Sequence, residues 1–253
     1  MAHPSPAAPT RLTAALLRIS GQPANGVLDQ AIALLSSDGS GLDITETIDV
    51  DASELASIPQ DMVNQLLPSQ MPDAGSGRDL LIAAHPSDPA VRALLRSVLG
   101  QSSTAVLLVG QYMTRTPRRL VAGIDFGRAS INALRLAHLL VPRATIHLVH
   151  IDQHDSSQNF IDEEERDGTD ALLSGVITHL GMHRSRIVYA RLSDSDPAAL
   201  SRYARFHGIE YIAAGTHGPH AANGIRAGGV ADILLGDVRS TVLMAPPMGD
   251  QPV

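Results

Sequence analysis

The sequence predicts an α/β protein in which parallel sheets are flanked by helices. Short apolar runs alternate along the chain with longer amphipathic segments, which is the pattern of strands joined by crossover helices. A similar segment closes each half of the chain, because residues 98–108 resemble residues 234–244 when Gly100 is aligned with Gly236. We therefore expect two domains of related construction, each with a parallel sheet and right-handed crossovers.

The first half of the chain contains four predicted strands. They are the short apolar or alternating runs at residues 12–19, 42–50, 79–84 and 105–109. Apolar residues at helical spacing predict helices over residues 25–35 and 88–100, and a weaker helical pattern covers residues 52–67.

The second half repeats this pattern more completely. Its predicted strands are residues 120–124, 145–151, 187–190, 211–214 and 241–245. Its predicted helices are residues 129–140, 169–180, 196–206 and 230–235. The polar segment 152–168 is expected to be a loop that leads into the second of these helices, with the acidic run 162–167 as a solvated helix start. We find no counterpart of the strand 187–190 in the first half, whose sheet should therefore be short of one strand.

Composition excludes several classes of function. The 253 residues carry a net charge of −7, which leaves no basic field for nucleic acid or an anionic membrane surface. The absence of cysteine excludes disulfides and thiolate chemistry, and it fits a cytoplasmic protein. All 19 basic residues are arginine, so a Walker-type phosphate loop and Schiff-base catalysis both lack their lysine. No apolar stretch is long enough to span a membrane.

The segment 210–246 carries the strongest functional signal. A short apolar strand breaks into a loop that has Gly215 and Gly218 at one end and Gly228 and Gly229 at the other, and a helix follows. Glycines let backbone amides approach an anion without a Cβ in the way, and the N-terminus of the helix favours negative charge. The loop is therefore a candidate phosphate cradle, and the alternative is a plain strand-to-helix turn. In the first half, residues 85–89 stand in place of this loop.

Three stretches of the second half resemble the universal stress protein family. They are AGIDFGRASINALRLAHLL at residues 122–140, AAGTHG at residues 213–218 and GGVADILLGDVRSTVLMAP at residues 228–246. The resemblance implies two adenine nucleotide α-hydrolase-like (Rossmann-like) domains of tandem type. It divides the chain into a disordered lead (1–10), a degenerate universal stress domain (11–112), a linker (113–119) and a universal stress domain with the nucleotide-type loop (120–248). It also implies that strands 105–109 and 241–245 pair to form an internal pseudo-dimer.

The same resemblance implies an adenine-nucleotide site in the second domain. Nucleotide-binding members have G-x2-G-x9-G followed by Ser or Thr, and this chain keeps the three glycines but has Gly229 at the fourth position. The positions that would line the site are Asp125, Ile151, Ala214, Gly215, His217, Gly218, Gly228, Gly229 and Val230. Tight binding of ATP would need Mg²⁺ or Mn²⁺, for which Asp125 is the natural ligand. The family often has a serine two residues after this aspartate, where Gly127 stands here.

We expect a cytoplasmic universal stress protein that binds ATP or a related adenine nucleotide as part of a stress response, with slow or absent hydrolysis. No catalytic constellation is present, since the chain has no G-x-S-x-G elbow and no carboxylates that can be paired on facing elements. One alternative is a nucleotide-free protein–protein interaction module with a vestigial crevice, and another is an enzyme with appreciable turnover. A protein partner and a further homodimer both remain open.

Other polar residues have simpler interpretations. Asp125 can cap the following helix instead of binding a ligand. His217 and His220 would need a third ligand to hold a metal, and His147 and His150 should lie on opposite faces of their strand. Arg115, Arg118 and Arg119 in the connector are interpreted as linker charges rather than as an anion site.

Overall fold

The structure is a computed structural model, and it describes twelve stretches of the chain. They are residues 12–19, 25–37, 42–50, 79–86, 89–101, 104–111, 113, 115–152, 163–194, 196–216, 229–237 and 239–247. The strands are β1 (Leu12–Ile19), β2 (Leu42–Val50), β3 (Leu80–Ala84), β4 (Ala105–Val109), β5 (Arg119–Gly123), β6 (Thr145–Asp152), β7 (Ile187–Ser193), β8 (Tyr211–Gly215) and β9 (Thr241–Ala245). The helices are α1 (Asn25–Ser37), α3 (Pro89–Gln101), α4 (Arg128–Leu140), α5 (Glu163–His179), α6 (Ala199–Phe206) and α7 (Val230–Leu235). The predicted helix 52–67 lies outside the described residues.

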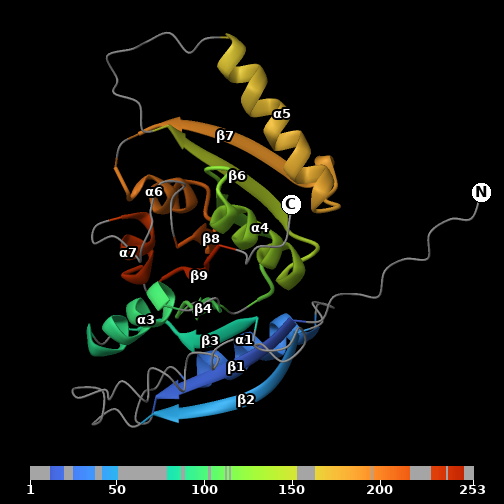
Figure 1. Ribbon diagram of the computed structural model, residues 1–253. Coiled ribbons are helices and arrows are strands. Elements are labelled where there is room, and N and C mark those ends of the chain that lie inside the picture. The colour runs from blue at the N-terminus through green and yellow to red at the C-terminus, as the bar shows by residue number, and fades with distance from the viewer. Residues whose placement is uncertain are drawn as a thin grey trace, which may run out of the picture.

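The strands form one nine-stranded sheet in the order β2-β1-β3-β4-β9-β8-β5-β6-β7 (Figure 1). Neighbouring strands are parallel except β4 and β9, which run antiparallel with Leu107 opposite Leu243. The predicted pairing of residues 105–109 with residues 241–245 is thus confirmed. This antiparallel pair joins the sheet of the first half to the sheet of the second half, edge to edge. The sequence predicts these two sheets as separate units.

The two halves share a strand order. In the second half it is β7-β6-β5-β8-β9, and in the first half β2-β1-β3-β4 follows the same path without the outermost strand. Among the described residues no strand pairs with the free edge of β2, and residues 51–78, where a counterpart of β7 would come, lie outside them.

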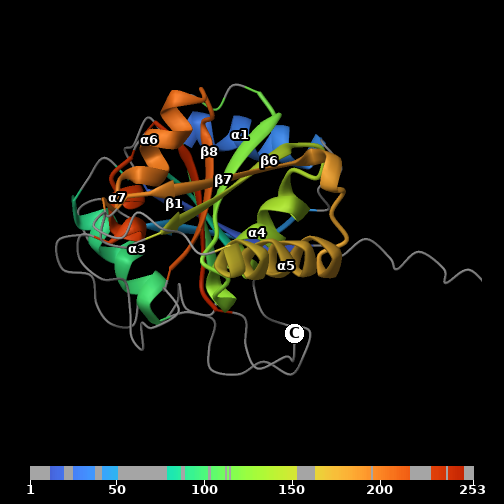
Figure 2. The same ribbon diagram turned by 90° about the horizontal axis from the view of Figure 1, so that it is seen from above.

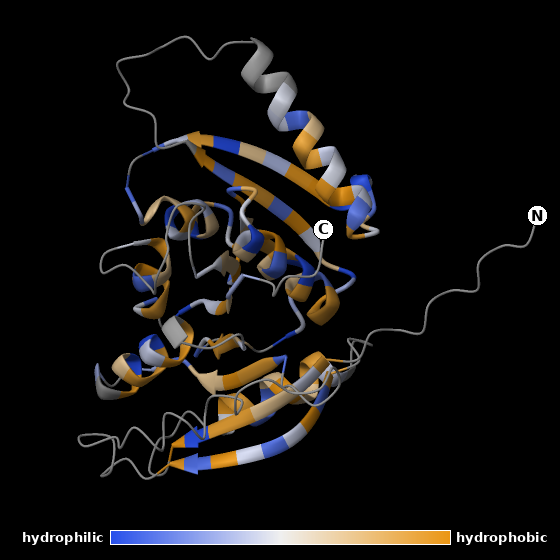
Figure 3. Cartoon of the chain, viewed as in Figure 1, coloured by the Kyte–Doolittle hydropathy of each residue, from blue (hydrophilic) through white to orange (hydrophobic). Residues whose placement is uncertain are grey.

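Helices cover both faces of the sheet. Helices α1, α4 and α5 pack on one face, and α3, α6 and α7 pack on the other (Figure 2). The central strands β3 and β4 are apolar along their whole length because both of their faces are buried, whereas the edge strand β2 alternates (Figure 3). None of the described helices has the length and apolar character needed to cross a membrane.

The starts of two helices differ from the prediction. Helix α5 begins at Glu163, six residues before the predicted start, because Gly168 does not interrupt the helix. Helix α6 begins at Ala199 rather than at Asp196. The Asp196 carboxylate accepts from the N–H of Ala198 and also pairs with Arg202, so this segment forms a turn ahead of the helix.

Several contacts join the halves beside the β4–β9 pair. His85 follows β3, and its Nε2 lies 3.2 Å from the carbonyl oxygen of Leu234 in α7. Arg96 of α3 forms an ion pair with Asp232 of α7. A Cβ on Gly110, just after β4, would lie 2.6 Å from the carbonyl oxygen of Arg239, so only glycine fits this approach of two backbones. His85 stands where the glycine loop is missing from the first half, and it serves here to join the first half to α7.

Candidate functional site

The strand order of the second half reverses between β5 and β8. From β5 the chain adds β6 and β7 on one side, and it then returns to add β8 and β9 on the other side. Open parallel sheets bind ligands outside the carboxyl ends of the strands at such a switch point. The strands here lead at that edge to Asp125 after β5, Ile151 near the end of β6 and Gly215 at the end of β8. Three of the predicted site residues therefore lie at one edge of the sheet.

Asp125 uses one carboxylate oxygen in a local turn. Its Oδ1 accepts a hydrogen bond from the N–H of Gly127 at 2.8 Å and another from the hydroxyl of Ser130 at 2.5 Å. Helix α4 begins directly after Gly127, so the negative charge lies at a helix N-terminus, where it is favoured. Among the described residues nothing donates a hydrogen bond to Oδ2. The carboxylate thus orders the start of the helix with one oxygen, while the other has no hydrogen-bond donor among the described residues.

Gly127 leaves room for the Asp125 carboxylate in its present orientation. A Cβ at this position would lie 3.0 Å from Oδ1 of Asp125, so a serine here would press against the carboxylate as it now lies. The hydroxyl that bonds Asp125 comes instead from Ser130 in the first turn of α4. Sequence reasoning missed Ser130, although a hydroxyl residue in the first turn of a helix that follows an aspartate is a visible signal.

The turn after β5 is held in an unusual backbone conformation. Phe126 has φ 59°, in the left-handed region that a bulky residue rarely adopts. Its ring lies against the ring of His150 with the centroids 5.5 Å apart, and Nδ1–H of His150 donates to the carbonyl oxygen of Ile124 at 2.7 Å. His150 on β6 therefore fixes the residues on either side of Asp125, and such strained positions gather at binding sites.

Gly215 is required by packing. A Cβ on it would lie 2.7 Å from the backbone nitrogen of Ser130 and 2.8 Å from Cβ of Ala129. The end of β8 thus touches the first turn of α4, and the glycine brings the β8 edge close to Asp125. This close approach explains the glycine whether or not a ligand binds beside it.

Three of the predicted site residues are apolar and lie on the face of the sheet that α3, α6 and α7 cover, opposite to the face that α4 covers. Ala214 is buried in the hydrophobic cluster shared with α3, α6 and α7, and Ile151 and Val230 pack against the same cluster while remaining partly accessible. They make an apolar surface beside the carboxyl ends of β6 and β8. Such a surface suits a flat, uncharged group such as a nucleobase.

Helix α7 begins after Gly229, which is extended with φ −76° and ψ 173°. The carbonyl oxygen of Gly229 accepts the first bond of the helix, from the N–H of Ile233 at 3.0 Å. The N–H groups of Val230 and Ala231, in the first turn, have no carbonyl partner earlier in the helix. The N-cap residue supplies no side-chain cap, since Gly229 stands where Ser or Thr would offer a hydroxyl.

The rest of the predicted loop lies outside the described residues. This applies to His217, Gly218 and Gly228, and to the candidate pair of His217 with His220. In the part of the chain that the structure describes, no group of three or more His, Cys, Asp or Glu side chains could hold a metal.

His147 and His150 lie on opposite faces of β6, as predicted. His147 contacts α6, where its Nδ1 lies 3.1 Å from the hydroxyl of Tyr203, whereas His150 contacts Phe126. Burial lowers the pKa of His147, and the neighbouring His207 and Arg119 lower it further. The two histidines thus form no joint site.

Comparison with known proteins identifies the fold. No family model matches the chain, and no curated protein matches it in sequence. Among solved structures, a universal stress protein from Archaeoglobus fulgidus DSM 4304 aligns with a TM-score of 0.60 at 12% identity, over 92% of this chain and 98% of that one.

Two proteins from Pseudomonas aeruginosa align less closely. A protein described as a candidate universal stress protein, from strain UCBPP-PA14, gives a TM-score of 0.51 at 17% identity, over 94% of this chain and 83% of that one. A protein of unknown function from strain PAO1 gives a TM-score of 0.50 at 17% identity, with the same coverage. The nine-stranded, mostly parallel sheet flanked by helices is therefore the Rossmann-like fold of the universal stress proteins.

Proposed function

We propose that this chain is a universal stress protein of tandem type that binds ATP or a related adenine nucleotide in its C-terminal half. The observation that carries the proposal is the position of Asp125 at the switch point, with one carboxylate oxygen fixed in the turn and the other without a hydrogen-bond partner among the described residues. A role in a cytoplasmic stress response, with hydrolysis slow or absent, follows from the resemblance of the sequence to the family.

The free oxygen of Asp125 suits either a ribose hydroxyl or a divalent cation carried by the nucleotide. Carboxylate oxygens are preferred ligands of Mg²⁺, which is bound in proteins through one or two carboxylates together with substrate phosphates. Mg²⁺ or Mn²⁺ would also offset the charge of the phosphates. Asp125 would hold this cation while Gly127 and Ser130 keep the carboxylate in one orientation.

The remaining parts of the site divide between base and phosphates. Ile151, Ala214 and Val230 would contact the base, and the N–H groups at the start of α7 would face the phosphates together with the glycine loop. Gly229 removes one hydroxyl contact to a charged phosphate, which is worth about 1.5–3 kcal/mol. We therefore expect binding about ten- to a hundredfold weaker than with a serine at this position.

The first half is proposed to be a degenerate copy without a nucleotide. Its four described strands follow the order of the inner four strands of the second half, which supports the tandem arrangement. His85 follows β3, where the second half has its glycine loop after β8, and it is buried against α7. We expect at most one nucleotide per chain.

Substitution of Asp125 by asparagine tests the site. The amide oxygen can still accept from Gly127 and Ser130, so the turn should survive while the negative charge is lost. We expect Asp125→Asn to weaken ATP binding in the presence of Mg²⁺ by about tenfold or more, measured by isothermal titration calorimetry.

The matched control is Asp43→Asn, on the exposed face of β2, which should bind ATP as the parent does. Gly218→Val, within the predicted phosphate loop, should abolish binding. Equal affinity of the parent and the Asp125→Asn variant would mean that Asp125 only caps α4. If variants of the glycine loop kept the cellular function of the protein, this result would support the alternative of a nucleotide-free protein–protein interaction module.

A further inference from the structure

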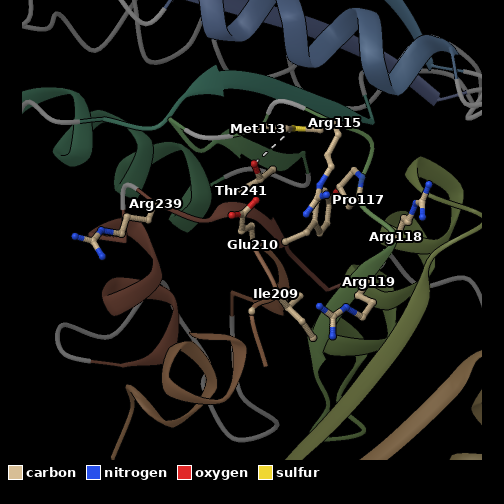
Figure 4. Close-up of a pocket in the computed structure, with 11 residues that line it drawn as sticks. Met113, Arg115, Pro117, Arg118, Arg119, Ile209, Glu210, Arg239 and Thr241 are labelled. Carbon is tan, nitrogen blue, oxygen red and sulfur yellow. Dashed lines mark hydrogen bonds between the residues drawn. The ribbon is translucent and has the colours of Figure 1, made fainter. Parts of the chain in front are cut away.

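A polar pocket lies at the opposite edge of the sheet from Asp125. It has a volume of about 150 Å³ and lies at the amino ends of β5, β8 and β9, where the connector after β4 crosses the sheet (Figure 4). Four arginines line it, namely Arg115, Arg118, Arg119 and Arg239. Because a strand of five residues is about 17 Å long, this pocket is separate from the carboxyl-end site.

The charges around the pocket are unbalanced. Glu210 is the single carboxylate among the described residues that line it, against four guanidinium groups. Within the same part of the chain, none of these arginines forms an ion pair with an acidic side chain. A local excess of three positive charges on a chain with a net charge of −7 is a marked asymmetry, and it attracts anions to this edge.

The arginines differ in how they lie. Figure 4 shows Arg115 extending over the pocket between Glu210 and Pro117, with Arg119 on the other side, while Arg118 and Arg239 point outward from the rim. All four are exposed, and their long side chains can change rotamer. Arg115 and Arg119 are therefore placed for direct contact with a ligand, and the other two strengthen the field.

A buried tyrosine and a threonine also line the pocket. Tyr211 lines the pocket and is only 1% exposed, and its hydroxyl has no hydrogen-bond partner among the described residues. Burial raises the pKa of Tyr211, so the phenol keeps its proton. The hydroxyl of Thr241 is already engaged, since it accepts from the N–H of Gly110 at 3.1 Å and contacts the sulfur of Met113. The four arginines are therefore the donors on which the pocket relies.

We propose that this pocket binds a small oxyanion of multiple charge, such as a di- or polyphosphate group or a polycarboxylate. The planar guanidinium offers paired N–H donors that match the oxygens of phosphate and carboxylate. The volume corresponds to about five water molecules, which suits pyrophosphate or citrate rather than a whole nucleotide. The sequence presents the arginines of the connector as linker charges. They become part of a site only when folding brings Arg239 and Glu210 beside them.

The test is a calorimetric titration of the full chain with pyrophosphate and with citrate, each against sodium chloride at equal ionic strength. We expect saturable binding of at least one anion, with a Kd of about 1 mM or below. The preferred anion then tells whether the site takes phosphates or carboxylates.

Variants assign the binding to this pocket. Arg115→Gln and Arg119→Gln should each weaken it by about tenfold, and Glu210→Gln should strengthen it. Arg184→Gln, an exposed arginine away from the pocket, should bind as the parent does. Because all these side chains are exposed or partly exposed, the variants should fold, which circular dichroism checks. Absence of saturable binding, or equal affinity in all the variants, would overturn the proposal.

Discussion

Replacement of Gly215 by alanine is expected to destabilise the fold by about 3 kcal/mol or more. The new methyl group would lie 2.7 Å from the backbone nitrogen of Ser130 and 2.9 Å from the carbonyl carbon of Ala129. Both are backbone atoms in the first turn of α4, so no change of side-chain rotamer relieves the clash. The free energy of unfolding in urea, measured by circular dichroism, gives the effect directly.

Gly175 provides the matched control. It lies on the exposed side of α5, and a Cβ built there meets no atom within 4 Å. Alanine favours a helix over glycine, so Gly175→Ala should stabilise the protein by about 0.5–1 kcal/mol. If both substitutions changed the free energy of unfolding equally, β8 and α4 would not lie close enough to exclude a methyl group at residue 215.

Loss of stability between pH 7 and pH 5 is the second large effect expected. Burial lowers the pKa of His85, His138 and His147 below the ordinary value of 6.5. Below pH 6.5 the unfolded chain therefore binds protons that the folded chain does not. Stability from these groups is complete above pH 6.5 and falls as the pH drops toward their folded pKa values.

His85 should contribute most to this slope because it is the most deeply buried of the three. A histidine that stays neutral in the folded state and is charged in the unfolded state contributes about 1.4 kcal/mol per pH unit. His138 and His147 should contribute less, because solvent reaches them more. The free energy of unfolding in urea, measured at pH steps from 7.5 to 5, gives the total slope.

The variant His85→Leu isolates this contribution. It loses the hydrogen bond to Leu234, which lowers stability at every pH, but it also removes the group that titrates. Its stability should therefore depend on pH less steeply than that of the parent below pH 6.5. A slope as steep as in the parent would show that His85 does not carry the effect.

The fold could be predicted where local pattern and burial agree. Residues 105–109 and 241–245 are continuous apolar runs because both faces of the central strands are buried, and their bounds match the prediction. The start of α6 could not be predicted, because it depends on the turn in which Asp196 binds the N–H of Ala198 and the side chain of Arg202.

The candidate site was predictable only in part, for a similar reason. An aspartate after a buried strand already indicates the edge of the sheet on which it lies, so the place of Asp125 follows from the sequence. The role of Ser130 depends on the left-handed turn at Phe126, and the need for Gly215 depends on how closely α4 approaches. The arginine pocket joins the connector to residues near β8 and β9, which no local pattern relates.

The measurement that most directly tests a nucleotide site in the C-terminal half is equilibrium binding of ATP with Mg²⁺ to the purified chain. We predict saturable binding with no more than one nucleotide per chain, lost in Gly218→Val and weakened in Asp125→Asn. Absence of binding at about 1 mM nucleotide would contradict the proposed function. A Kd of about 1 mM already corresponds to a binding free energy of only about −4 kcal/mol.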